Sequence, residues 1–174
     1  MRRIDTKLTG WIAGLPRRLE LFFSLITNLG HPAVVIGMGA GFVALGIVRP
    51  HLSLFIMGIA IWITLGTGSL LKLLIHRARP LTDYAAKIWL DKLSFPSGHT
   101  TGATIAFGLL AYWSWLSLPR AWSIVAAISA GILIFLVGVS RIYLGAHFPS
   151  DVVAGWLLGG VGLVATILLL QSLS

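Results

Sequence analysis

Two histidines and one aspartate are the residues of this chain best suited to catalysis. His147 and Asp151 are four positions apart, so on a helix they would share a face and could hydrogen-bond. An aspartate that holds one imidazole nitrogen fixes the tautomer and leaves the other nitrogen free to attack. His99 comes from another stretch and can protonate a leaving oxygen, because an imidazole with a pKa of about 6.5 exchanges protons near neutral pH. The three residues predict nucleophilic catalysis assisted by a general acid.

Cationic and small residues lie beside these three and predict a phosphate site. Lys72 and Arg79 are seven positions apart, about two helical turns, and would line one wall if the helix continued that far. Ser97 is a natural N-cap residue, and a phosphate can approach the backbone of Gly98 closely at a helix N-terminus. Arg141 supplies a planar fork that suits two phosphate oxygens.

A metal ion is the alternative way to stabilise such a phosphate. Two histidines and one carboxylate could ligate zinc. However, Lys72, Arg79 and Arg141 would repel a cation, and no second carboxylate belongs to these stretches. We therefore expect no metal and no cofactor, with the three cations stabilising the phosphate oxygens instead.

The elements that carry these residues are membrane-spanning helices. The chain has 174 residues, of which 57% are hydrophobic and only 10% charged, far fewer charges than a soluble domain carries. Five apolar runs are long enough, or nearly so, to cross a bilayer. They are roughly Pro32–Val48, Leu52–Ile75, Thr100–Leu118, Ala121–Val139 and Val152–Leu170. The sequence predicts an all-α integral membrane bundle, in which Gly155 and Gly159 would allow close helix packing.

The N-terminal thirty residues have a different pattern. Between Leu8 and Leu29, apolar residues recur at helical spacing while charged residues lie off that stripe, and Pro16 is expected to interrupt the segment. We expect residues 1–30 to form an amphipathic segment at the membrane interface, ahead of a transmembrane catalytic domain at residues 31–174. A sixth spanning helix is the alternative.

With five spans, all the candidate site residues fall on one face of the membrane. Of the thirteen Lys and Arg residues, eleven lie on that face, and Arg49 and Arg120 lie on the other. The net charge of +8 is spread over short gaps between apolar runs, which favours lipid headgroups or an anionic substrate as partners and argues against nucleic acid. The chain has no cysteine, so disulfides and thiolate metal sites are excluded.

Three motifs resemble the signature of the type 2 phosphatidic acid phosphatase (PAP2) superfamily. They are K-x6-R-P at Lys72–Pro80, P-S-G-H at Pro96–His99 and S-R-x5-H-x3-D at Ser140–Asp151. Each motif alone is weak, but all three in this order are specific, and the resemblance covers roughly residues 20 to 170. The usual bacterial member has six spanning helices, whereas five runs are visible in this chain.

The resemblance implies a role for each matched residue. His147 would form a phosphohistidine, Asp151 would orient it, and His99 would serve as acid and then as base for water. Lys72, Arg79, Ser97, Gly98 and Arg141 would bind the phosphate. The implied protein is a multi-pass lipid phosphatase of the bacterial inner membrane, and the related enzymes mostly work on the outer face. The positive-inside rule points to the cytoplasmic face, and we favour the outer one.

The substrate and several side chains stay open at this point. Undecaprenyl and other polyprenyl diphosphates, phosphatidic acid and phosphatidylglycerol phosphate all fit, and the oligomeric state is not predicted. A lipid phosphotransferase with the same residues, or a non-catalytic binder or transporter of lipid phosphates, are the alternatives. We expect His31 and His51 to be interfacial, and His76 and Arg77 to be solvated. Asp83, Tyr84 and Asp91 in the long loop could gate the site or contact a headgroup.

Overall fold

The computed structural model describes residues 2–86 and 92–173, and within them every element is a helix. The only extended pairing in this part is an isolated bridge between Ala78 and Leu93. The elements follow the chain as α1 (Arg2–Ala13), the short 3₁₀ helix η1 (Arg17–Leu19), α2 (Glu20–Leu29), α3 (Pro32–Val48), α4 (Leu52–Ile75), α5 (Asp83–Ala86), α6 (Gly98–Ser117), α7 (Arg120–Tyr143) and α8 (Pro149–Ser172). The predicted all-α class is confirmed, and the five predicted apolar runs correspond to α3, α4, α6, α7 and α8.

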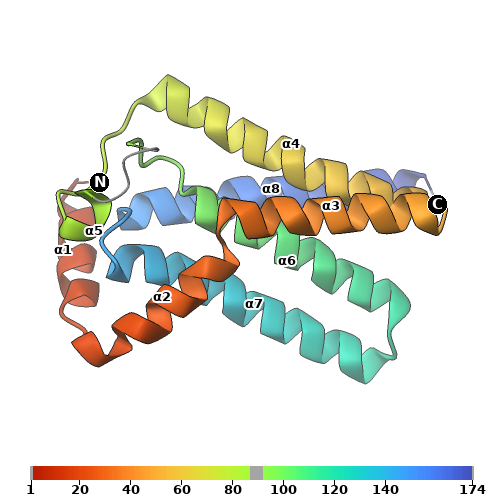
Figure 1. Cartoon of the computed structure of the whole chain (residues 1–174), viewed down its shortest axis with the longest axis horizontal. Coiled ribbons are helices and arrows are strands. Elements are labelled where there is room, and N and C mark those ends of the chain that lie inside the picture. Colours follow the sequence, from red (N-terminus) through yellow and green to blue (C-terminus); the bar gives the residue numbers. More distant parts are fainter. Residues whose placement is uncertain (1, 87–91, 174) are drawn as a thin grey trace.

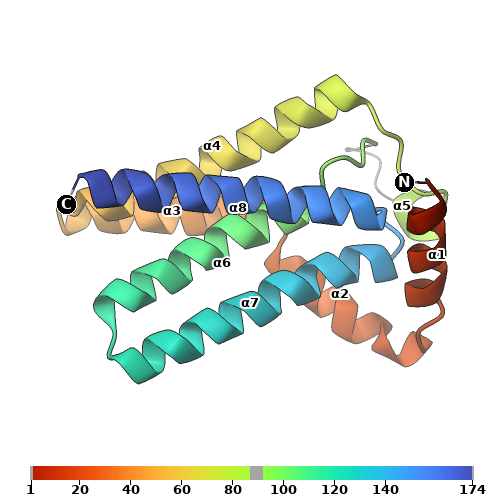
Figure 2. The same ribbon diagram turned by 180° about the vertical axis from the view of Figure 1, so that it is seen from behind.

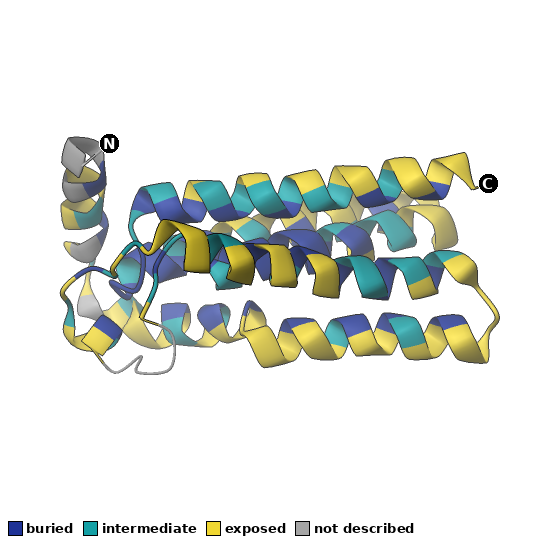
Figure 3. Cartoon of the chain, turned by 90° about the horizontal axis from the view of Figure 1, so that it is seen from above, coloured by how far each residue is buried: buried dark blue, intermediate teal, exposed yellow. Residues whose placement is uncertain are grey.

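Five long helices run side by side and α6 lies among them (Figure 1; Figure 2). Helix α6 packs against α7 and α8, while α3 packs against α4. Every residue from 100 to 107 is buried, whereas the outward faces of the other long helices carry exposed apolar side chains (Figure 3). Such a surface suits a lipid environment, because water would not tolerate so much exposed apolar area.

Helices α6 and α8 touch at the two glycines that the sequence singled out. A Cβ atom on Gly155 would lie 2.8 Å from Thr100 Cβ, and one on Gly159 would lie 2.6 Å from Thr104 Cβ. The predicted small-residue contact face is therefore confirmed, and its partners are threonines on α6. This contact fixes the start of α6 beside the start of α8, which brings the second and third sequence motifs together.

Among residues 2–86 and 92–173, four helical segments are long and apolar enough to cross a membrane by length and composition. They are Glu20–Val48, Leu52–Ile75, Arg120–Tyr143 and Pro149–Ser172. Helix α6 has 20 residues but is not among them. Its buried first half carries Thr100, Thr101 and Thr104, which lower the mean hydropathy of the helix, whereas its second half exposes Leu110 and Trp115.

The N-terminal segment lies across the site end of the bundle (Figure 1). Helix α1 ends at Ala13, before Pro16, as the proline predicts. Ile12 is buried against Ile142 and Val152 from α7 and α8, so α1 is anchored to the ends of these two helices. Helix α2 packs against α7 and continues, after the break at Gly30 and His31, into α3.

Candidate active site

His147 and Asp151 come together at the start of α8, but in a different way from that predicted. Helix α8 begins at Pro149 and its N-cap is Phe148, so His147 lies before the helix and Asp151 in its first turn. The two residues do not share a helix face, because the proline starts the helix after the histidine. The turn nevertheless places His147 Nδ1 3.6 Å from Asp151 Oδ2, and both side chains are buried.

The other nitrogen of His147 faces a guanidinium group. Arg79 Nη1 lies 3.0 Å from His147 Nε2 and also donates to the carbonyl oxygen of Ala146 at 2.9 Å. A guanidinium can only donate, so Nε2 is the accepting nitrogen in this contact and its lone pair points at Arg79. In the neutral ring the proton then sits on Nδ1, on the side of Asp151. This is the tautomer that nucleophilic attack by Nε2 requires.

Burial keeps His147 neutral. Desolvation, followed by the charges of Arg141, Arg79 and Lys72, holds the pKa of His147 well below its ordinary value of 6.5, although the backbone of Ser94 acts in the opposite direction. A neutral imidazole is nucleophilic and an imidazolium is not. The same cations that would bind a phosphate therefore also favour the neutral form of His147.

Lys72 and Arg79 reach one cavity, but not along one helix as we expected. Helix α4 ends at Ile75, and His76 caps it with a left-handed backbone at φ 50°, donating its amide to the Lys72 carbonyl. Pro80 disfavours helical backbone at the preceding residue, which helps to explain why the helix stops before Arg79. Lys72 thus comes from the last turn of α4 and Arg79 from the loop that follows.

Arg141 lies in the last turn of α7 and is almost fully buried. Its Nη1 donates to Thr27 Oγ1 at 2.8 Å and lies 3.5 Å from the hydroxyl oxygen of Tyr84. Thr27 belongs to α2 and Tyr84 to α5, so two elements outside the signature motifs hold this guanidinium in position. Tyr84 is one of the three loop residues for which the sequence predicted no definite role. Asp83 is exposed, and Asp91 lies outside the described residues.

The P-S-G-H motif begins α6 as predicted, with Ser97 at the N-cap position. Ser97 does not cap the backbone with its side chain; its Oγ accepts a hydrogen bond from Thr100 Oγ1 at 2.9 Å, and the residue is fully buried. A Cβ on Gly98 would meet one atom only, Lys72 Nζ at 3.9 Å. Gly98 therefore leaves open the space in front of the lysine, where a phosphate would sit.

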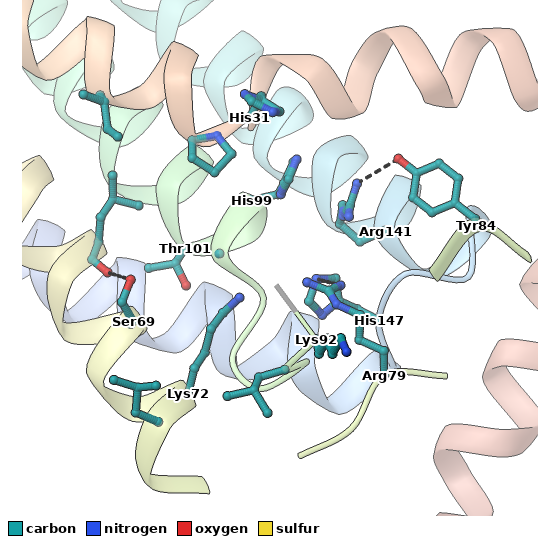
Figure 4. Close-up of a pocket in the computed structure, with 17 residues that line it drawn as sticks. His31, Ser69, Lys72, Arg79, Tyr84, Lys92, His99, Thr101, Arg141 and His147 are labelled. Carbon is teal, nitrogen blue, oxygen red and sulfur yellow. Dashed lines mark hydrogen bonds between the residues drawn. The ribbon is translucent and has the colours of Figure 1, made fainter. Parts of the chain in front are cut away.

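One cavity of about 750 Å³ collects most of the predicted residues (Figure 4). Its lining includes the predicted Lys72, Arg79, Gly98, His99, Arg141 and His147. Ser97 and Asp151 are fully buried and are not among the residues that line it. In the part of the chain that the structure describes, no group of three or more His, Asp or Glu side chains could hold a metal ion. Catalysis without metal stays a prediction.

Two residues that we expected to lie outside the site are in contact with it. His31 lines the cavity, and its ring lies edge-on to that of His99 with the centroids 5.7 Å apart. Its position just before the first apolar run, on the site face, was a signal for this placement. His51, in contrast, lies at the opposite end against Trp113.

Arg77 is the second correction, because it is not simply solvated. Its guanidinium pairs with Asp151 at 2.7 Å and with Asp5 at 2.8 Å, whereas the neighbouring His76 is exposed as expected. These partners lie 74 and 72 positions away, and no local pattern points to them.

Comparison with known proteins agrees with this arrangement. The family model of the PAP2 superfamily matches residues 53–173, which include all three motifs. This chain belongs to the PAP2 superfamily. Phosphatidylglycerophosphatase B of Bacillus subtilis is 38% identical over 108 residues, covering 59% of this chain and 52% of that protein. Decaprenylphosphoryl-5-phosphoribose phosphatase of Mycobacterium tuberculosis is 36% identical over 110 residues, covering 56% and 55%. The matches thus span about half the length of these two relatives.

A solved structure extends the similarity to almost the whole PAP2 chain described here. The transmembrane PAP2-type phosphatidylglycerolphosphate phosphatase from Bacillus subtilis superposes with a TM-score of 0.85 at 27% identity. The superposition covers 99% of this chain and 87% of that one, so the N-terminal helices are included. The chain is accordingly a multi-pass membrane protein.

Proposed function

We propose that this chain is a metal-independent membrane phosphatase that releases phosphate from a lipid phosphomonoester or diphosphate. The observation that carries the proposal is the orientation of His147, with Nδ1 toward Asp151 and Nε2 toward the cation-lined cavity. A binding site for phosphate needs cations, but it does not need a buried histidine whose accepting nitrogen faces them. The arrangement therefore favours turnover over simple binding.

The proposed reaction has two steps. In the first, Nε2 of His147 attacks phosphorus, the bond from phosphorus to the lipid oxygen breaks, and His99 gives its proton to that oxygen. In the second, His99 takes a proton from water, the water oxygen attacks phosphorus, and the P–N bond breaks to release phosphate. Lys72, Arg79 and Arg141 would hold the equatorial oxygens throughout, with Gly98 and Ser97 shaping the site.

The walls of the cavity support a lipid substrate. Beyond the cations, the cavity is lined by apolar side chains of α3 and α4, including Ile36, Leu65 and Leu73. Helix α4 diverges from the rest of the bundle toward the site end (Figure 1; Figure 2). A phosphate could thus lie among the cations while its acyl or prenyl tail stays against apolar side chains. Polyprenyl diphosphates, phosphatidic acid and phosphatidylglycerol phosphate are the candidates.

The proposed membrane arrangement has five spans, α3, α4, α6, α7 and α8, with α6 enclosed by the others. Helices α1 and α2 would lie at the interface as the N-terminal segment of residues 1–30, preceding a catalytic domain of residues 31–174. The amphipathic pattern of α1 and its position across the end of the bundle support this assignment for α1, whereas α2 packs obliquely along α7 (Figure 1). We place the site on the outer face of the membrane.

The test is phosphate release by detergent-solubilised protein from a panel of lipid phosphates and diphosphates, with and without EDTA. The unmodified protein should release phosphate in EDTA, and His147→Ala should lower kcat by more than about 10³-fold. His51→Ala is the matched control, since His51 lies far from the cavity. Release that EDTA abolishes, or that His147→Ala retains, would overturn the mechanism. Phosphate passed to an added lipid or sugar acceptor would identify a transferase.

A further inference from the structure

Asp5 in the N-terminal helix is one of the most enclosed charged residues of the protein. Only 4% of its surface is exposed. The chain holds five acidic residues in all. Its carboxylate accepts hydrogen bonds from the Ser150 amide at 3.0 Å, the Ser150 hydroxyl at 2.8 Å and Arg77 Nη2 at 2.8 Å. Both oxygens are thus engaged with residues far along the chain. An ordinary interfacial helix has no need of such a buried carboxylate.

Arg77 links Asp5 directly to the residue that faces the nucleophile. Its Nη1 donates to Asp151 Oδ1 at 2.7 Å and to Ser150 Oγ at 2.6 Å, while its Nη2 donates to Asp5. The guanidinium also lies over the Phe148 ring, 4.4 Å from the centroid. The carboxylates of Asp5 and Asp151 fix the plane of the Arg77 guanidinium, because each of its two terminal nitrogens donates to a different carboxylate.

Asp5 also takes the place of an N-cap on α8. The N-cap residue is Phe148, whose side chain has no oxygen, so the first amides of the helix need acceptors from elsewhere. Asp151 Oδ2 accepts from the Phe148 amide at 2.9 Å, and Asp5 Oδ1 accepts from the Ser150 amide. A carboxylate is favourable at this positive end of the helix. A residue of α1 therefore caps the helix turn that carries Asp151.

These contacts form one connected path to the nucleophile. Asp5 holds Arg77 and the first turn of α8, Arg77 holds Oδ1 of Asp151, and Oδ2 of Asp151 faces Nδ1 of His147. We propose that Asp5 is a positioning residue for catalysis, and that α1 docks on the bundle to orient Asp151 through Arg77 and the Ser150 amide. The proposal rests on the proposed function, in which His147 is the nucleophile.

The charge state of Asp5 is consistent with this role. Burial acts to raise the pKa of Asp5, but hydrogen bonds from Arg77 and Ser150 outweigh it and hold the pKa below its ordinary value. The carboxylate is therefore ionised at neutral pH. With Asp5 removed, Arg77 would lose one of its two anionic partners and the Ser150 amide its acceptor, so Asp151 would be less firmly oriented.

The test compares Asp5→Asn and Asp5→Ala with Glu20→Gln, which removes an exposed carboxylate from the neighbouring helix α2. The measurements are kcat and KM for phosphate release, with the melting temperature in detergent. Asp5→Ala should lower kcat by about 10-fold while KM changes by less than about twofold, because the phosphate ligands are untouched. Asp5→Asn has nearly the same shape, so it should fold and lose about threefold in kcat. Glu20→Gln should match the unmodified protein.

A second comparison, made in Asp151→Asn protein, separates an effect of Asp5 on positioning from an effect on stability. In Asp151→Asn protein, the further change Asp5→Ala should cost little in kcat, because the residue it acts through is already altered. A full, additive loss in that background would overturn the proposal, as would folded Asp5→Ala protein with unchanged kcat. If unmodified protein releases no phosphate, or His147→Ala stays active, the proposed function has failed. An active, His147-dependent enzyme that is indifferent to Asp5 refutes only this inference.

Discussion

At the scale of single residues, the two nitrogens of His147 have different surroundings and therefore different roles. Nδ1 faces the buried carboxylate of Asp151. Nε2 faces the guanidinium of Arg79, which can donate a hydrogen bond but cannot accept one. The imidazole lies between Asp151, 3.6 Å from Nδ1, and Arg79, 3.0 Å from Nε2, and Nδ1 makes no hydrogen bond within the described residues. The arrangement has consequences for pH dependence.

The acid limb of kcat/KM should lie below pH 6.5, because burial and the nearby cations depress the pKa of His147. Activity falls only as the pH drops through that depressed value and the ring becomes protonated. The same depression makes the unfolded chain bind more protons between the two pKa values, so the folding stability contributed by His147 also falls as pH drops below 6.5. Profiles of kcat/KM from pH 4.5 to 9 would measure the limb.

Arg141→Gln tests the cause of this shift. The variant removes the largest charge contribution and should move the acid limb to higher pH, while kcat/KM at the optimum falls about 10²-fold through the lost phosphate contact. Arg120→Gln, at the opposite end of the bundle, is the control and should leave the profile in place. An acid limb at or above pH 6.5 in the unmodified protein would contradict the electrostatic argument.

His31 should contribute a donor to the cavity. Its Nδ1 accepts the Ala33 amide at 3.2 Å, so the neutral ring carries its proton on Nε2. His31→Asn keeps a capping acceptor at the start of α3 but withdraws this donor, and should lower kcat/KM roughly 3- to 10-fold, the value of one hydrogen bond. His51→Asn makes the same substitution at the N-cap of α4, at the other end of the molecule, where the histidine side chain does not cap the helix. Equal effects of the two variants would show that His31 acts only on the helix.

At the scale of elements, the sequence predicted the helices well and their contacts poorly. The bounds of α3 and α4 agree with the apolar runs, because hydropathy depends on local composition. The three motifs named six of the seventeen residues that line the cavity, because residue types at fixed spacing can be read locally. The ion pairs of Arg77 could not be predicted, since Asp5 lies 72 positions away and a single acidic residue in an amphipathic helix has no local signal. Arg79 was placed on a helix because the left-handed turn at His76 follows no local rule of composition.

The close approach of α6 and α8 should be sensitive to a single methyl group. In Gly159→Ala, the new Cβ would lie 2.6 Å from Thr104 Cβ and 2.7 Å from the Thr101 carbonyl oxygen, forcing the helices apart. We expect a loss of about 1–3 kcal/mol in stability, with lower activity because the starts of both helices carry the site. Gly160→Ala, which meets no atom within 4 Å, should be neutral or slightly stabilising. Melting temperatures in detergent measure both, and similar losses in the two variants would refute close packing as the cause.

At the scale of the whole molecule, the basic residues of the described part gather at the site end. The turns that carry Arg49 and Arg120 lie at the far end (Figure 1), and the sequence holds eleven further Lys and Arg residues. Five of the eleven line the cavity or support it: Lys72, Arg77, Arg79, Lys92 and Arg141. Five of the remaining six precede Leu19. Few of these charges lie in the short loops to which the positive-inside rule applies, so the count does not require a cytoplasmic site.

Because the chain has no cysteine, single introduced thiols can report its orientation. Asp83→Cys places a thiol on an exposed residue of α5 at the site end, and Ser117→Cys places one on the exposed last residue of α6 at the far end. With the site on the outer face, a membrane-impermeant maleimide should label Asp83→Cys in intact cells and label Ser117→Cys only after the membrane is permeabilised. Retained phosphatase activity would show that each variant is folded. The reverse labelling pattern would put the site in the cytoplasm, and the substrate would then have to be a lipid phosphate of the inner leaflet.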